Sequence, residues 1–173
     1  MSLRADGPGM ESPIQHHRVG IANDLQWIDG ELESLGSPHN FINQDGLDVL
    51  TVTNALVAPW TFTGLPSSRV TPVILRRDNV QFVIFNEEEG LADFRDPPRK
   101  ETLILNLPLA IVRGGVPYLS EARLANFLDF WKGTFFPVTD AQIHYLARSQ
   151  APQPAHARII YINRAAIQSY SEA

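Results

Sequence analysis

The feature that most constrains this fold is an internal repeat. When Phe41 is placed beneath Phe127, FINQDGLDVLTVTNALV aligns without a gap on FLDFWKGTFFPVTDAQI, with identical Phe, Val, Thr and Ala and several like-for-like pairs. Downstream, VILRRDNVQ (73–81) aligns with IYINRAAIQ (160–168), and upstream QWIDGEL (26–32) aligns with AIVRGGV (110–116). Any two strand-rich stretches share Val and Thr, but here the order and the spacing also agree. The pattern therefore indicates a duplicated structural unit.

Each copy is predicted to form about five short strands. DVLTVTNALVA and FFPVTDAQIHYLA alternate with the period of two that half-buried strands show. RVGIANDLQWIDGEL and ETLILNLPLAIVRGGV each predict paired strands with a bulge or bend near the Gly. TPVILRRDNVQFVIF and ARIIYINRAAIQSY each predict a strand, a tight polar turn and another strand.

One helix is predicted in the second copy, over LSEARLANFLDFWKG. Ser120 is a suitable N-cap, Leu119 and Leu124 occupy hydrophobic-staple positions, and Gly133 can end the helix. The first copy has GSPHNFINQDG there, which allows no more than a turn. The predicted organisation is a flexible N-terminal tail (1–13), a first β repeat (14–85), a charged linker closed by Pro97 and Pro98 (86–100) and a second β repeat (101–173).

The motifs resemble two known families. DGEL, VLTVTNALV and PVILRRDNV resemble the two-part signature of Sm-like proteins. RLANFLDF, FFPVTDAQI and IYINRAAI resemble an uncharacterised bacterial family of small β domains. The resemblance implies a mainly β chain of two tandem five-stranded SH3-like or Sm-like barrels, with one short helix in the second copy and no known activity.

In Sm-like proteins an Arg-Gly turn and a polar loop contact RNA, so the resemblance implies a candidate nucleic-acid site. Its residues here are Arg76, Arg77, Asn79, Asn163 and Arg164. Arg77 replaces the family's glycine, and the second copy offers Asn163 and Arg164 instead. The net charge of −5 argues against general nucleic-acid binding, because phosphates are held mostly by Lys and Arg. RNA or nucleotide binding is therefore the alternative hypothesis.

No catalytic constellation, metal site or cofactor site is predicted. The chain has no Cys, and no His-Glu-x-x-His pair, Gly-x-Ser-x-Gly elbow or phosphate-cradling Gly-rich loop occurs. The longest apolar runs fall far short of the ~20 residues of a membrane-spanning helix. We expect a non-enzymatic protein of the cytoplasm.

The expected function is a binding or assembly module, with a regulatory role as one option, that presents strand edges and the short helix to a protein partner. TLILNLPLAIV (102–112) carries no charge and is expected to be an edge strand that needs cover, either from the tandem copy within the chain or from a partner. Phe130 falls beside the apolar stripe of the helix and next to Trp131, so these two residues are the predicted protein interface. A homodimer is the expected assembly. The aromatic residues either fill the cores, which we favour, with Phe130 as the exception, or line a ligand groove; they are Trp27, Trp60, Phe62, Phe130 and Trp131.

Overall fold

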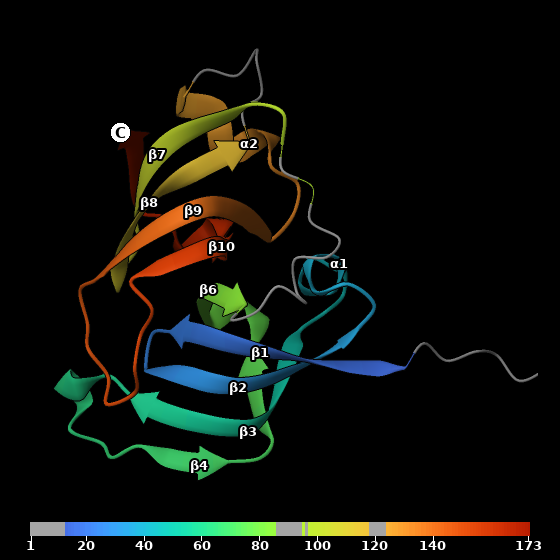
Figure 1. Cartoon of the computed structure of the whole chain (residues 1–173), viewed down its shortest axis with the longest axis vertical. Coiled ribbons are helices and arrows are strands. Elements are labelled where there is room, and N and C mark those ends of the chain that lie inside the picture. Colours follow the sequence, from blue (N-terminus) through green and yellow to red (C-terminus); the bar gives the residue numbers. More distant parts are fainter. Residues whose placement is uncertain (1–12, 86–94, 96, 118–123) are drawn as a thin grey trace, which may run out of the picture.

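The computed structural model describes residues 13–85, 95, 97–117 and 124–173. Eleven strands of this part of the chain form one antiparallel sheet (Figure 1). In the first half these are β1 (Ile14–Asn23), β2 (Gln26–Leu35), β3 (Val49–Pro59), β4 (Ser68–Val70), β5 (Val73–Arg76) and β6 (Val80–Phe85). In the second half they are β7 (Lys100–Asn106), β8 (Ala110–Pro117), β9 (Phe135–Tyr145), β10 (His156–Asn163) and β11 (Ser169–Glu172). The predicted tail and most of the predicted linker lie outside the described residues.

The strands follow the same order in both halves. The first half runs β6, β1, β2, β3, with β4 and β5 both paired to β3, and the second runs β11, β7, β8, β9, β10. The halves are joined where β10 pairs with β6, so one half lies above the other in Figure 1. The expected pair of closed barrels is not found, and the sheet is open. The reason is that β6 takes β10 of the other half as its second neighbour, and not β5 of its own half.

The prediction that residues 102–112 form an edge strand is also wrong. Most of 102–112 belongs to β7 and β8, and β7 lies between β8 and β11. The absence of charge from 102–106 therefore reflects a strand with a neighbour on both sides. Among the described residues the sheet ends at β11 on one side and at β4 and β5 on the other.

The bend near each glycine is confirmed. The register of β2 on β3 shifts between Asp29 and Glu31, around Gly30, and that of β8 on β9 shifts around Gly114. A Cβ on Gly30 would lie 2.9 Å from a backbone oxygen of β3, and a Cβ on Gly114 would lie 2.9 Å from the corresponding oxygen of β9. Such distances leave no room for a side chain.

Each glycine faces a residue with left-handed backbone on the adjacent strand. These residues are Asn54 on β3, with φ of 49°, and Asp140 on β9, with φ of 50°. Asn and Asp are the non-glycine residues that adopt this conformation most readily. Both halves thus bend the same two strands by the same means.

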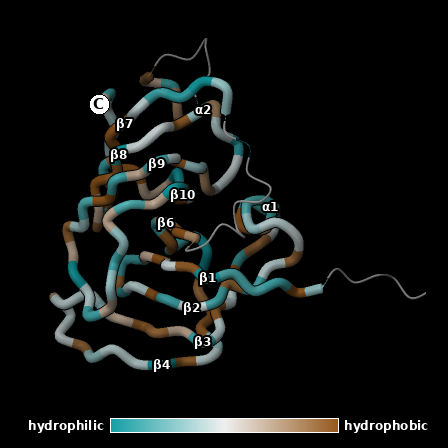
Figure 2. Tube along the Cα trace, in the orientation of Figure 1, coloured by the Kyte–Doolittle hydropathy of each residue, from teal (hydrophilic) through white to brown (hydrophobic). Residues whose placement is uncertain are grey.

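Two apolar cores lie on opposite faces of the sheet, and each contains side chains from both halves. Trp27 and Phe82 of the first half pack in one core with Val138 and Ile160 of the second. The other core joins first-half residues to Phe135, Ile159 and Tyr161. Figure 2 shows apolar residues spread over the strands of both halves. Trp27 and Trp60 are buried as expected, whereas Phe62 is exposed.

The helical segments are short. In the first half, α1 (Pro38–Ile42) begins at Ser37, whose side chain accepts a hydrogen bond from the Asn40 backbone N–H. In the second half, a 3-10 turn leads into α2 (Phe127–Phe130), which ends before Gly133. The predicted N-terminal part of this helix, with Leu119 and Ser120, lies outside the described residues. No helix in the described part of the chain has the length and apolar character needed to cross a membrane.

Candidate protein-interaction surface

The joint between the halves shows how this sheet accepts another strand. β10 and β6 pair antiparallel, with Tyr161 opposite Val83. The Tyr161 side chain is fully buried, and its ring lies 5.5 Å from that of Phe85 and 5.4 Å from that of His39. Burial raises the pKa of Tyr161 to about 12 and lowers the pKa of His39. An outward-facing side chain of the second half thus completes the core of the first.

The positions of the first half that correspond to this contact are exposed. By the repeat, Ile74 on β5 corresponds to Tyr161 on β10, and Val49 on β3 corresponds to the fully buried Phe135 on β9. Ile74 is 57% exposed and Val49 is 42% exposed. Among the described strands, β5 pairs with β3 alone. The same apolar surface that is covered at the joint is therefore uncovered at this edge of the sheet.

The uncovered side chains extend over neighbouring strands. Alternation places Leu50 and Leu75 in the core, so Val49 and Ile74 point to the opposite face. Ile14 on β1 and Leu35 on β2 form a cross-strand pair, and each is more than half exposed. These four exposed side chains, Ile14, Leu35, Val49 and Ile74, form the apolar patch.

A shallow groove of about 260 Å³ is lined by three of the four members of the apolar patch, Ile14, Leu35 and Val49. Thr51, which lies opposite Ile74 on the neighbouring strand, lines the groove and so connects it to the edge strand β5. The other lining residues are Ile14, Glu33, Ser34, Leu35, Phe41, Leu47 and Val49. A concave apolar surface beside an exposed strand edge fits a protein contact better than it fits a polar small molecule.

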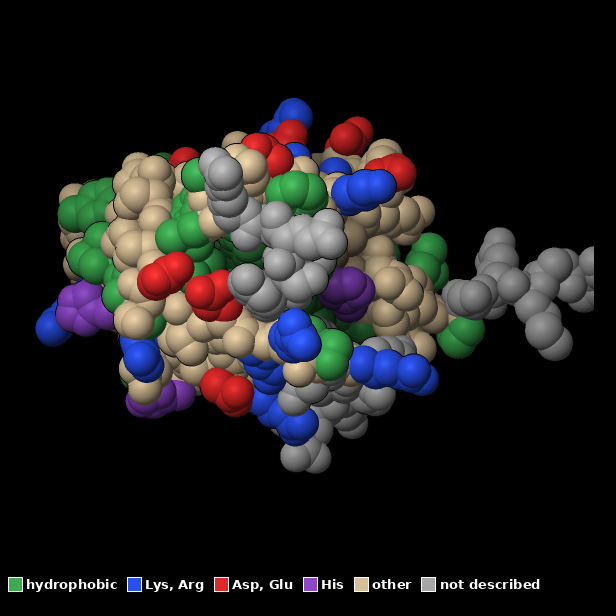
Figure 3. Space-filling model, turned by 90° about the horizontal axis from the view of Figure 1, so that it is seen from above, with side chains coloured by type: hydrophobic (Ala, Val, Ile, Leu, Met, Phe, Trp, Pro, Cys, Tyr) green, Lys and Arg blue, Asp and Glu red, His purple; other side chains and the backbone are tan. Residues whose placement is uncertain are grey.

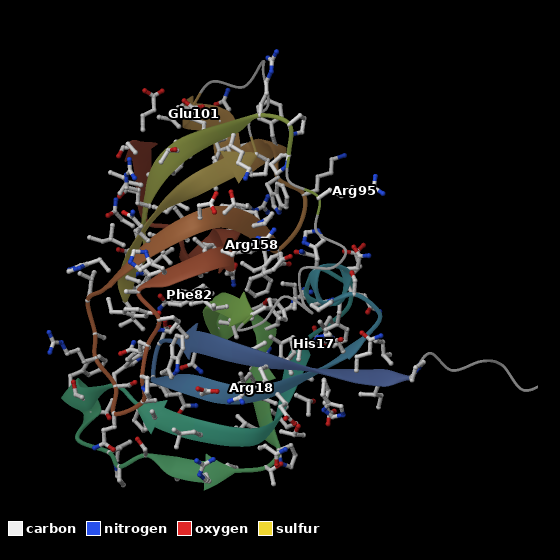
Figure 4. The ribbon with its side chains drawn as sticks, in the orientation of Figure 1. His17, Arg18, Phe82, Arg95, Glu101 and Arg158 are labelled. Carbon is white, nitrogen blue, oxygen red and sulfur yellow. The ribbon has the colours of Figure 1, made fainter. Side chains whose placement is uncertain are left out.

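The opposite edge of the sheet is polar. By the repeat, Ser169 and Ser171 on β11 correspond to Phe82 and Ile84 on β6. Phe82, labelled in Figure 4, is fully buried at the joint, whereas both serines are exposed. Tyr170 between them turns inward, and its hydroxyl donates a hydrogen bond to the Leu124 carbonyl (2.9 Å). The β11 edge thus lacks the apolar side chains that β6 uses to receive β10.

The predicted RNA-binding residues hold the fold together at several points. The Arg77 guanidinium donates to the carbonyl of Gln44 (2.8 Å), and that of Arg164 donates to the carbonyl of Trp131. Asn163 is buried, and its amide donates to the Val80 carbonyl (2.8 Å), next to Asn79. The joint therefore brings Asn163 close to the turn of the first half.

Arg76 and Asn79 are exposed, while Arg77 and Asn163 are turned into local contacts. Basic and acidic side chains are mixed over the face seen in Figure 3. The guanidinium groups of Arg77 and Arg164 donate to carbonyls near the ends of helices. These contacts give no specific support for RNA recognition.

The predicted interface on α2 divides into two different environments. Phe130 is 52% exposed, as expected for a contact residue. Trp131 is half-buried, its indole N–H donates to the Phe135 carbonyl (3.1 Å), and its ring packs 6.0 Å from that of Phe136. Only Phe130 is therefore placed to meet a partner, and it belongs to the other half of the chain from the apolar patch.

A second groove, of about 270 Å³, crosses the outer side of β1 to β4 and was not anticipated from the sequence. Arg18, labelled in Figure 4, lies 3.9 Å from the Asp29 carboxylate, and the Asn54 amide donates to the Glu31 carboxylate (3.1 Å). These opposite charges interact within the groove, and several of the side chains are exposed. Nothing in the groove selects one kind of ligand.

Comparison with protein-family models, with curated proteins and with solved structures finds no match.

Proposed function

We propose that the protein is a non-enzymatic assembly module of the cytoplasm that binds a protein partner through the edge strand β5. The observation that carries the proposal is the contrast between Ile74, which is 57% exposed, and Tyr161, which occupies the same place in the repeat and is fully buried. At the joint, burial of Tyr161 accompanies the addition of a strand. A partner strand added to β5 would bury Ile74 in the same way.

The chemistry of strand addition fits this edge. An added strand gains main-chain hydrogen bonds from the N–H and C=O groups of the edge, and its alternate side chains enter neighbouring hollows. The groove beside Thr51 provides such a hollow. Natural sheets guard their free edges with charges or Pro, whereas three of the four residues of β5, Val73, Ile74 and Leu75, are apolar.

We further infer that each half is a copy of one small β unit of Sm-like or SH3-like type. The shared strand order, the bulges at Gly30 and Gly114 and the left-handed Asn54 and Asp140 support this inference. So do the backbone N–H groups of Arg77 and Arg164, which donate to Asp48 and Thr134 at 2.9 Å in equivalent places. The RNA-binding alternative gains no comparable support.

The test compares partner capture by three chains: the wild type, Ile74→Lys and Phe130→Lys. The two substitutions add the same charge at similarly exposed sites, on β5 and on α2. We expect Ile74→Lys to lose a bound protein, or self-association, that Phe130→Lys retains, because a buried lysine opposes strand addition. Retention by Ile74→Lys together with loss by Phe130→Lys would move the interface to α2, and equal behaviour of all three chains would refute both surfaces.

A further inference from the structure

We infer that the partner of β5 is β5 of a second copy of the chain, related by a twofold axis through Ile74. This inference rests on the proposed function and adds the identity and the geometry of the partner. It commits to an isologous dimer, in which the same surface of each copy faces the other.

The first step excludes the most obvious alternative, head-to-tail pairing. The joint between β10 and β6 suggests that β5 of one copy could pair with β11 of the next, which corresponds to β6. At the joint, however, β6 offers Val83 opposite Tyr161 and the buried Phe85 on the same face. The equivalent residues of β11 are Tyr170, whose hydroxyl is bonded to the Leu124 carbonyl, and the exposed Glu172, so the apolar patch would gain little apolar contact there.

The second step concerns the self-complementarity of β5. Antiparallel pairing of two β5 strands about Ile74 places the two Ile74 side chains next to each other. It also places Val73 opposite Leu75, and Pro72 opposite Arg76, of the second copy. No two like charges are opposed, and such opposition is what would destabilise a pair of strands.

The third step extends the contact beyond the strand. Val49 and Ile74 lie on the same outward face, and Ile14 and Leu35 belong to the same groove-lined patch. A twofold axis at Ile74 brings the two apolar patches to the same side of the joined sheets. The two Ile74 side chains, each with Val49 on the adjacent strand β3, can therefore cover each other, which the polar β11 edge cannot do.

Cysteine crosslinking tests this geometry, because the chain contains no Cys of its own. We expect Ile74→Cys to form a disulfide-linked dimer under mild oxidation at low micromolar concentration, since a twofold axis places each residue 74 beside its equivalent. Phe130→Cys is the matched control on α2, and it should remain at the level of random collision. A 1:1 mixture of Ile74→Cys and Tyr170→Cys chains reports head-to-tail pairing, because Tyr170 corresponds to Val83, the partner of Tyr161 at the joint.

Light scattering completes the test. The wild type should have twice the monomer mass of 19.3 kDa, and Ile74→Lys should have the monomer mass while keeping the wild-type circular dichroism spectrum. A mixed crosslink between residues 74 and 170 without a 74–74 crosslink would overturn the inference in favour of head-to-tail assembly, and a crosslink of Phe130→Cys alone would overturn it in favour of α2. A monomeric wild type with no crosslink would also overturn it, and the proposed function would then depend on the capture experiment with Ile74→Lys.

Discussion

Gly30 and Gly114 carry the same steric demand in the two halves, and this allows a paired prediction. The added methyl group in Gly30→Ala or Gly114→Ala would lie 2.9 Å from a backbone oxygen and closer still to Val52 or Val138. We expect each substitution to lower the free energy of unfolding by about 1–3 kcal/mol, because a backbone oxygen has little freedom to move away. Urea denaturation measures the effect.

Gly36→Ala separates crowding from backbone strain. Gly36 has φ of +76°, and a Cβ there would have no neighbour within 4 Å. Its substitution should therefore cost only the strain of the left-handed backbone, about 1–2 kcal/mol. If Gly114→Ala lowers the free energy of unfolding by no more than Gly36→Ala does, crowding at Gly114 is refuted.

His39 provides a pH dependence. Desolvation lowers its pKa in the folded protein, so the unfolded chain binds more protons between that lowered pKa and the ordinary histidine value of 6.5. The contribution of His39 to the free energy of unfolding is therefore fully present above about pH 6.5, and it decreases as the pH falls through this window. We expect the wild type to lose more stability between pH 7.5 and pH 5 than His39→Gln, as measured by denaturation at each pH.

The carboxylates are common to both chains, so the difference between the two pH profiles reports on His39 alone. Parallel profiles for the wild type and His39→Gln would contradict the assignment.

Strands were predictable individually, but their neighbours were not. The alternating pattern in DVLTVTNALVA and FFPVTDAQIHYLA located β3 and β9, because local burial on one face leaves a period of two in the sequence. The uncharged part of β7, 102–106, was predicted to be an edge, because a strand with two neighbours and an unguarded edge strand have the same composition. β4, with three exposed residues, leaves no such pattern and was not predicted.

Tyr161 tests how much the joint contributes to stability. The side chain is fully buried, so Tyr161→Ala should cost about 3–5 kcal/mol, as large-to-small changes of buried aromatic residues do. Its hydroxyl makes no hydrogen bond with the described residues, so Tyr161→Phe should be neutral or stabilising. Thermal denaturation of the two variants measures both effects, and a cost for Tyr161→Phe above about 1 kcal/mol would show that the hydroxyl has a partner.

Both cores contain side chains of both halves, and the whole molecule should therefore unfold as one unit. A chain cut between residues 90 and 91 should give two fragments that fold together when mixed, since β6 and β10 still complete one sheet. Each fragment alone should lack a cooperative transition. Circular dichroism and calorimetry of the fragments, separately and mixed, check this expectation, and a stable cooperative fold of either fragment alone would contradict it.

The apolar patch illustrates what sequence reasoning can supply and where it stops. The repeat aligns Ile74 with Tyr161, so the sequence alone shows that the two residues are equivalent. The sequence does not show that β10 and β6 of different halves become neighbours. The exposure of Ile74 is significant only because this contact buries the equivalent residue Tyr161. Phe130 was identified from helical spacing, a purely local signal, and its exposure agrees with that prediction.

The pairing of β10 with β6 also has a consequence for synthesis on the ribosome. β6 is translated long before β10, since the chain from Phe85 to His156 comes between them. At roughly 5–20 residues per second, that interval lasts for several seconds. Until β10 is made, the first half presents the second edge of β6 without a neighbour and a core without Tyr161. The nascent chain is therefore most exposed to aggregation in the middle of its own translation, and only its last strands close both cores.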